Sequence, residues 1–215
     1  NIVKKQIDLH GEKTENALNM VATDAHRLAI FKSSLEGKGD FTGIIPRKTV
    51  IELMKILPKQ DGDIEFYINT NNIVFMSKKF TFKSKLIDGN YPNYNQVVPQ
   101  GEGSKITFNR KNMLDSLSRV SVLTSEKFKG VKLKADSGVL DISAHNPDQE
   151  SAEEKLDVTG ASGDFDIAFN VNYLKEVLGT IDEEEISLVS FGSDKSALVE
   201  SGDTNQVLVL MPLLL

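Results

Sequence analysis

One pattern recurs three times along this chain: a short strand, an amphipathic helix and about three further strands. The apolar stripes of the three helices begin at Val50, Met113 and Leu174, so the copies are 63 and 61 residues apart (113 − 50 and 174 − 113). A period near 60 exceeds that of solenoid repeats, which favours pairs of copies that form compact two-helix domains over a stack of repeats. We therefore predict an α+β fold of duplicated β-α-β-β-β units, with helices on one face of antiparallel sheets.

The first complete copy starts with a strand at 41–45, after strands predicted at 2–9 and 17–32, a polar connection at 11–16 and a loop at 37–40. Pro46 suits the first turn of a helix, and Pro58 ends it. The stripe of this helix consists of Val50, Leu53, Met54 and Leu57. Strands are predicted at 64–68, 73–76 and 80–86, with a turn at 71–72.

The second and third copies repeat this order. A strand at 106–108 leads to the N-cap candidate Asn109, and a strand at 165–169 leads to the N-cap candidate Asn170. The second stripe is Met113, Leu117 and Val120, interrupted by Ser116, and the third is Leu174, Val177, Leu178 and Ile181. Strands are predicted at 130–135, 138–144, 150–158, 186–191, 196–200 and 206–211.

Length and composition fit two globular domains. The chain has 215 residues, 40% of them hydrophobic and 26% charged, and no cysteine. No apolar run approaches the roughly 18 residues of a membrane-spanning helix. Pro92 and the segment 99–104 are linker-like, which predicts domains at 1–99 and 100–215. Because the chain begins at Asn1 without an initiator methionine, we expect a fragment or an unseen start. The absence of cysteine fits a reducing cytoplasm.

The segment 21–30 is the hardest to explain as core. Thr23 and Asp24 favour a turn, because their short side-chain oxygens bond nearby backbone N–H groups. His26 and Arg27 follow beside apolar neighbours. One interpretation is a tight hairpin with a solvated arginine and a packed histidine, and the other is a surface cleft.

Catalysis has little support in the sequence. The three histidines, His10, His26 and His145, lack the spacing of a helical zinc site, and there is no G-x-S-x-G motif or P-loop. Asp24 and His26 are a candidate pair for a metal or for acid–base chemistry, but no third ligand is evident. A metal-dependent hydrolase is therefore the alternative function, and we predict no catalytic residue, metal or cofactor.

Charge is unevenly distributed over a chain of net charge −6. The segment 46–60 has a local charge of +3 and the segment 109–123 of +2, whereas 170–181 is neutral. The basic helices are either solvated faces or a surface for phosphates. An acidic cluster of Asp148, Glu150, Glu153 and Glu154 suits a basic partner.

The carboxyl terminus, 207–215, is apolar to its last residue, although chain ends are usually polar and frayed. A final strand explains the part up to 211. The residues after Pro212 are predicted to be either buried or an exposed apolar patch of the kind that marks a binding site.

Six ordered motifs resemble the bacterial DNA polymerase III beta subunit family, the sliding clamps. They are Ala22–Leu28 (ATDAHRL), Ile45–Lys48 (IPRK), Lys85–Tyr94 (KLIDGNYPNY), Ser125–Val131 (SEKFKGV), Asn146–Pro147 (NP) and Met211–Pro212 (MP). The resemblance covers essentially the whole chain. It implies the second and third domains of a three-domain protein, without the first, in which two copies close head to tail into a ring around duplex DNA.

The resemblance also implies a pocket for short linear peptides between the second and third domains. Its residues would be Thr23, Ala25, His26, Arg27, Leu28, Pro92, Gln96, Val97, Asn170, Tyr173, Ser196, Val209, Leu210, Met211, Pro212 and Leu213. Ala25 stands where the family usually has glycine, Gln96 where arginine is common, and Leu213–Leu214 where Met-Arg is common. We expect a pocket that is less positive and more apolar than usual.

A non-catalytic, cytoplasmic processivity factor is the function that the resemblance implies. Its partners would be duplex DNA without sequence preference, the DNA polymerase III catalytic subunit, the clamp loader, other polymerases and repair proteins that carry clamp-binding peptides, and a second copy in a homodimer. The predicted DNA-facing residues are Arg47, Lys48, Arg110, Lys111 and Arg119. The predicted dimer interface contains Val122, Leu123, Glu150, Glu153 and Glu154.

Overall fold

The computed structural model describes residues 9–14, 17–36, 39–59, 62–124, 129–160 and 165–214. The chain divides into two compact units, one of residues 1–25 and 29–93 and the other of residues 26–28 and 94–215. The units therefore separate between Asn93 and Tyr94, whereas the sequence predicts a domain boundary after residue 99. Predicted features at 2–8, 15–16, 37–38, 125–128 and 215 lie outside the described residues.

The second unit contains two β-α-β-β-β repeats in the predicted order. The first repeat consists of β8 (Ser104–Asn109), α2 (Arg110–Val120), β9 (Gly130–Asp136), β10 (Val139–His145) and β11 (Ser151–Asp157). The second consists of β12 (Phe165–Asn170), α3 (Val171–Leu178), β13 (Glu185–Ser190), β14 (Ala197–Glu200) and β15 (Gln206–Leu210). This confirms the predicted α+β class.

The two repeats exchange their first strands. β12 pairs with β9 of the preceding repeat, with Phe169 opposite Val131, and the strand order of that antiparallel sheet is β11-β10-β9-β12. β8 pairs with β13 of the following repeat, with Ile106 opposite Leu188, and the order there is β15-β14-β13-β8. Each sheet is therefore completed by a strand from the other repeat.

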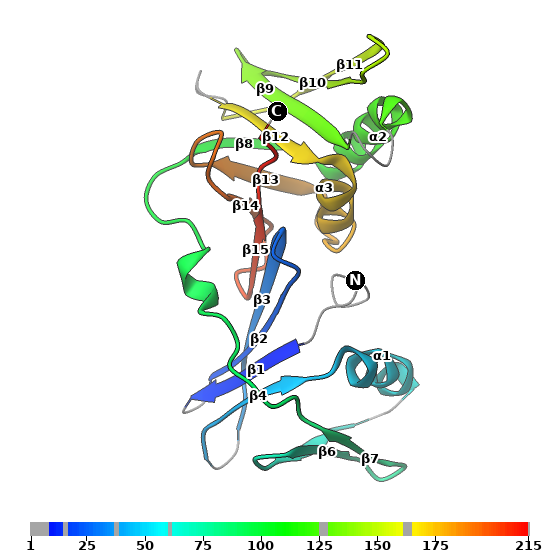
Figure 1. Ribbon diagram of the computed structural model, residues 1–215, viewed down its shortest axis with the longest axis vertical. Coiled ribbons are helices and arrows are strands. Elements are labelled where there is room, and N and C mark those ends of the chain that lie inside the picture. Colours follow the sequence, from blue (N-terminus) through cyan, green and yellow to red (C-terminus); the bar gives the residue numbers. More distant parts are fainter. Residues whose placement is uncertain are drawn as a thin grey trace. The chain divides into compact units, whose positions relative to one another are not determined.

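Helices α2 and α3 lie next to each other (Figure 1). The predicted stripe residues of both helices, together with Ile181, belong to the core. The sequence predicts that Ser116 interrupts the stripe of α2, but Ser116 is itself buried with it. Its hydroxyl accepts a hydrogen bond from Arg119 Nη2 at 3.0 Å. A small polar residue is accommodated in the core when it has a partner.

Both helices begin at the predicted asparagine caps. The side chain of Asn109 accepts a hydrogen bond from the backbone N–H of Asn112 at 3.1 Å. The side chain of Asn170 accepts one from the N–H of Asn172 at 3.0 Å. Each cap satisfies one of the N–H groups that the first helical turn leaves without an intrahelical partner.

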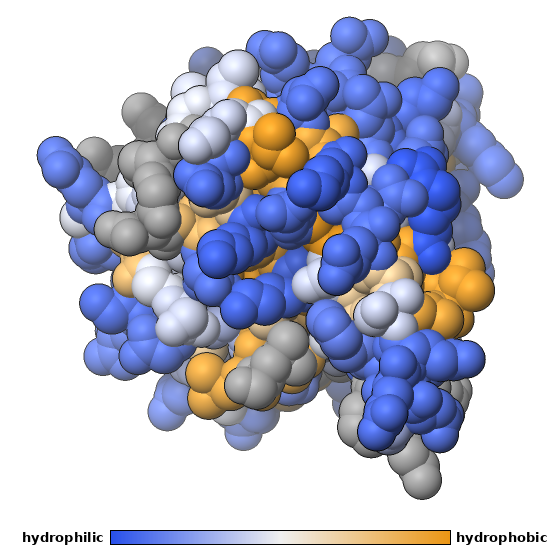
Figure 2. Space-filling view, turned by 90° about the horizontal axis from the view of Figure 1, so that it is seen from above, coloured by the Kyte–Doolittle hydropathy of each residue, from blue (hydrophilic) through white to orange (hydrophobic). Residues whose placement is uncertain are grey.

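In the sheet of β9 to β12, the strands β9 and β10 alternate buried with more exposed side chains, β11 alternates half-buried with exposed ones, and β12 is mostly buried. Figure 2 views the molecule from the side of this sheet and shows hydrophilic side chains over most of the surface, with hydrophobic ones between them. Exposed charged residues include Lys132, Lys134, Asp141 and Glu153, while Leu133 and Ile142 are buried. A period of two with one polar face is typical of an antiparallel sheet that covers a core on one side.

The first unit contains one helix and two sets of paired strands among its described residues. Its elements are β1 (Leu9–Thr14), β2 (Ala17–Thr23), β3 (Arg27–Ser34) from residue 29 on, β4 (Phe41–Ile45), α1 (Arg47–Ile56), a 3₁₀ turn (Leu57–Lys59), β5 (Glu65–Ile68), β6 (Asn72–Met76) and β7 (Thr81–Lys85). β1 pairs with β2 on one side and with β4 on the other. β5, β6 and β7 form an antiparallel meander.

The predicted polar connection at 11–16 is wrong in its described part, because Gly11–Thr14 belongs to β1. These polar residues form a strand because the backbone of β1 makes hydrogen bonds with two neighbouring strands, β2 and β4. Lys13 is buried, and its ammonium group donates to the carbonyl oxygen of Gly39 at 3.3 Å. A lysine can pack its long apolar stem when its charged end finds an acceptor.

The predicted stripe of α1 is only partly correct. Leu53 is buried, but Met54 is 42% exposed and Leu57 36% exposed, and the second buried side chain of the helix is Thr49. The strands at 17–32 also differ from the prediction, because they are two strands separated at residues 24–26. Helix α1 has no neighbouring helix among the described residues of its unit, unlike α2 and α3, so less of its surface is covered.

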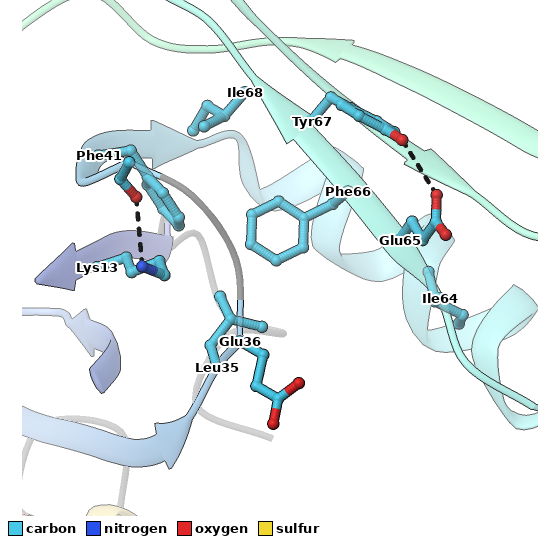
Figure 3. Close-up of a pocket in the computed structure, with 10 residues that line it drawn as sticks. Lys13, Leu35, Glu36, Phe41, Ile64, Glu65, Phe66, Tyr67 and Ile68 are labelled. Atoms are coloured by element: carbon cyan, nitrogen blue, oxygen red, sulfur yellow. Dashed lines mark hydrogen bonds between the residues drawn. The ribbon is translucent and has the colours of Figure 1, made fainter. Parts of the chain in front are cut away.

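A cavity of about 520 Å³ lies beside β5 in the first unit (Figure 3). Phe41 and Phe66 meet edge to face in its wall, with ring centroids 5.5 Å apart. At its edge the Tyr67 hydroxyl donates to the Glu65 carboxylate at 3.1 Å. In the described part of this unit β5 pairs with β6 alone, so one edge of the meander borders this cavity.

We expect the equivalent stripe positions Leu117 and Met54 to differ in their contribution to stability. Leu117→Ala removes a fully buried side chain and should lower the free energy of unfolding by about 2–5 kcal/mol. Met54→Ala removes a half-exposed side chain and should cost less than about 1 kcal/mol. Calorimetric unfolding of the two variants checks this, and equal losses would contradict the burial described above.

Candidate functional site

The predicted turn after β2 is formed by a local hydrogen bond. The hydroxyl oxygen of Thr23 accepts from the backbone N–H of Ala25 at 3.2 Å. Ala25 has a φ of 69°, which lies in the left-handed region that favours glycine. The residues after it, His26, Arg27 and Leu28, belong to the second unit.

The structure reverses the hairpin interpretation with a solvated arginine and a packed histidine. His26 is exposed, whereas Arg27 is only 1% exposed. Arg27 Nη1 lies 2.8 Å from Glu176 Oε2 on α3, and the guanidinium carbon lies 4.7 Å from the centre of the Tyr173 ring. A buried cation requires such compensation, because it has lost its water.

The exposed His26 is held by two contacts. Its ring stacks on Tyr173 with centroids 5.4 Å apart and planes 23° apart. Its carbonyl oxygen accepts from the backbone N–H of Met211 at 2.9 Å. His26 therefore lies against both α3 and the end of β15.

The apolar tail after β15 is attached to the second unit by its backbone. Besides the Met211 bond, the N–H of Leu213 donates to the carbonyl oxygen of Ala168 at 2.7 Å. Pro212 and Leu213 are partly buried, while Met211 and Leu214 are exposed. Of the two predicted outcomes, each therefore holds for part of the tail.

Most residues of the predicted peptide pocket belong to the second unit. Leu28, Val209 and Leu210 are buried, and Gln96 and Val97 are exposed. The hydroxyl of Ser196 donates to the carbonyl oxygen of Val97 at 2.9 Å, which attaches the segment after residue 93 to the residue that precedes β14. The predicted pocket residues of the first unit are Thr23, Ala25 and Pro92.

Two of the predicted DNA-facing cations have partners within the second unit. Arg110 Nε donates to the carbonyl oxygen of Glu183 at 2.9 Å. Arg119 binds the Glu154 carboxylate through two nitrogens, at 2.7 and 2.8 Å. Lys48 and Lys111 are exposed, and Arg47 is half-buried.

The predicted dimer-interface residues lie around β11, an edge strand of its sheet, and the turn after α2. Val122 is 80% exposed, Leu123 is half-buried and Glu153 is exposed. Glu150 accepts a hydrogen bond from the Asn146 side chain at 2.6 Å. Glu154 is the partner of Arg119, whose hydrogen bonds lower the pKa of the Glu154 carboxyl group.

The described residues do not support a metal centre. They contain no group of three or more histidine, aspartate or glutamate side chains placed to hold a metal ion. His10 stacks on Tyr91 with ring centroids 4.5 Å apart, and burial lowers the pKa of the His10 side chain.

Among the described helices, none is long and apolar enough to cross a membrane.

Comparison with family models identifies both parts of the chain. Residues 8–93 match the central domain of the DNA polymerase III beta subunit, and residues 95–214 match its C-terminal domain. The chain belongs to this family. The resemblance noted in the sequence is thereby confirmed.

Relatives and solved structures agree with the family models. The chain is 37% identical to the beta sliding clamp of Pseudomonas aeruginosa over 94% of its own length and 56% of that protein. It is 36% identical to the Escherichia coli beta sliding clamp over 91% of its length and 54% of that protein. The chain thus spans little more than half of these curated relatives.

A crystal structure of the Pseudomonas aeruginosa clamp bound to griselimycin superposes with a TM-score of 0.91, at 37% identity, over 97% of this chain and 57% of that one. The clamp of Bartonella birtlesii bound to griselimycin gives 0.90 at 32% identity, over 100% of this chain and 59% of that one. The fold described above is therefore the fold of known sliding clamps.

The backbone of Ala25 gives a testable prediction about the departure from the family's usual glycine. Ala25→Gly relieves the left-handed strain, partly offset by the greater freedom of glycine in the unfolded chain, and should raise the free energy of unfolding by about 0.5–1 kcal/mol. Ala29→Gly, within β3, is the matched control and should lower it by a similar amount. Denaturant unfolding of both variants measures the two shifts, and a loss of stability in Ala25→Gly would contradict the assigned backbone conformation.

Proposed function

We propose that this chain acts as part of a non-catalytic DNA sliding clamp, a processivity factor that tethers polymerases to duplex DNA in the cytoplasm. The observation that carries the proposal is the match of both units to the beta-subunit family, with relatives named as beta sliding clamps. In this proposal the protein is a homodimer that closes around DNA. Its partners are the DNA polymerase III catalytic subunit, the clamp loader, and other polymerases and repair proteins.

The proposed partner-binding site uses the surface formed by His26, Met211 and their neighbours in the second unit. His26 and Met211 are exposed side chains joined by a backbone hydrogen bond, so they present one continuous surface. Tyr173 and Arg27 lie behind them. An apolar surface with a few ordered polar groups suits a short peptide with a leucine and an aromatic residue near its end.

The charge of this surface supports an uncharged peptide as the ligand. Arg27 is buried against the carboxylate of Glu176, and positions 96 and 214 carry glutamine and leucine in place of the family's common arginines. Burial of the two peptide side chains contributes roughly 1.5–3 kcal/mol each. Association costs several kcal/mol, offset partly by backbone hydrogen bonds, so we expect an affinity near 1 µM, or about −8 kcal/mol.

Deletion of residues 211–215 should weaken binding of such a peptide by about thirtyfold, or 2 kcal/mol, because it removes the Met211 side chain and the bond to His26. The measurement is fluorescence anisotropy of a labelled, polymerase-derived peptide, with circular dichroism to verify folding. Leu214→Ser is the control, since Leu214 is 79% exposed and should matter less. Unchanged affinity after the deletion would place the site elsewhere.

The proposed DNA contacts are electrostatic and few. Lys48 and Lys111 are exposed members of the predicted set, and Arg119, which is also exposed, is paired with Glu154. Each phosphate contact adds about 0.9 to the slope of log affinity against log salt. The family resemblance implies no helix that reads base edges in a groove. In a closed ring, retention on DNA would come from topology more than from affinity.

Lys111→Glu should weaken binding to a labelled duplex by roughly twofold to fivefold at low salt and should act equally on duplexes of different sequence. Lys134→Glu, on the exposed face of β9, carries the same change of charge outside the predicted DNA surface and should have little effect. Gel-shift titrations at two salt concentrations separate the variants. Tight, sequence-selective binding at physiological salt would contradict the proposal.

A further inference from the structure

Helix α3 carries a glutamate that the family resemblance does not assign to the peptide site. Glu176 and Tyr173 are three residues apart and therefore lie on the same face of the helix. The helix itself is anchored in the core by Val171, Leu174, Val177 and Leu178, all of them buried. The two side chains therefore project from a fixed base.

Arg27 connects these two side chains. Its guanidinium group reaches Glu176 Oε2 at 2.8 Å while its carbon lies 4.7 Å from the centre of the Tyr173 ring. The planar guanidinium can stack on an aromatic ring and pair with a carboxylate at the same time. The carboxylate thus holds the cation against the ring.

The Tyr173 ring connects the buried Arg27 to the exposed His26. It stacks on His26 at 5.4 Å, and the backbone of His26 accepts from Met211 at 2.9 Å. His26 and Met211 are the exposed side chains of the proposed peptide site, whereas Arg27 is buried. A chain of contacts therefore runs from Glu176 through Arg27 and Tyr173 to His26.

We propose that Glu176 is a positioning residue of the peptide site. It holds the guanidinium of Arg27 over Tyr173 and thereby fixes the orientation of Tyr173 and His26 before the peptide arrives. This inference rests on the proposed function of the site. A preorganised surface binds more tightly because less freedom is lost on association.

Glu176→Gln tests the role of the carboxylate with almost no change of shape. A neutral amide cannot form this ion pair and leaves the buried cation without its countercharge. We expect affinity for the labelled peptide, measured by anisotropy, to fall about tenfold. Glu185→Gln makes the same change at an exposed position of β13 and should bind as the unaltered chain does.

A double-mutant cycle shows whether Glu176 acts through Arg27. If it does, Arg27→Gln combined with Glu176→Gln should bind no more weakly than Arg27→Gln alone. Losses that multiply in the double variant would overturn the proposal, because Glu176 would then act on the peptide independently.

The NMR chemical shifts of the His26 ring protons in the peptide-free chain test the positioning role separately, because a loss of global stability alone would not change them. The Tyr173 ring current shifts the ring protons of His26, and Glu176→Gln should move them toward their values in an unstructured peptide. A variant that melts earlier but keeps both the His26 shifts and the peptide affinity would reduce Glu176 to a structural residue and overturn the proposal. If the unaltered chain binds no peptide, the proposed function fails, and the His26 shifts still decide whether Glu176 orders this surface.

Discussion

The exchange of first strands between repeats is the constraint on which the second unit depends. β12 completes the sheet of the first repeat and β8 completes the sheet of the second, so each repeat needs a strand from the other to complete its sheet. The two sheets and the helix pair must therefore form together. This pairing also fixes β12, which leads directly into α3 and accepts the backbone of Leu213 through Ala168. The surface formed by His26, Tyr173 and Met211 is thus supported by the same strands that hold the core together.

The site illustrates how a short turn acquires a defined shape. Within the turn, the backbone N–H of Ala25 donates to the Thr23 hydroxyl, and the backbone passes through a left-handed conformation at Ala25. What orders the next residues is a set of contacts within the second unit: a buried arginine, a stacked histidine and a backbone bond from the tail. Local sequence therefore sets where the chain turns, and tertiary contacts set what the turn presents.

The sequence predicted what periodicity and local chemistry control. The order of elements, the asparagine caps and the stripes of α2 and α3 follow from spacing and from hydrogen-bonding side chains near their own backbone. Arg27 and Lys13 could not be placed in this way, because their burial depends on acceptors that are distant in sequence, Glu176 and the Gly39 carbonyl. The exposure of Met54 likewise depends on whether a second helix packs against α1. The spacing of apolar residues predicts a helix but not which elements cover it. Most site residues came from the family resemblance, whereas Glu176 has no such signal and emerged only from its contact.

The pairing of Arg119 with Glu154 has a consequence for genetics. Arg119 belongs to the predicted DNA surface and Glu154 to the predicted dimer interface, yet each is the other's bidentate partner. The same guanidinium also donates to the hydroxyl of Ser116, a buried residue of α2. An allele that alters Arg119 thus releases a carboxylate on the edge strand and disturbs the helix at once. Its phenotype would be pleiotropic, and separation-of-function alleles for DNA contact are better sought at Lys111, whose side chain is exposed on α2.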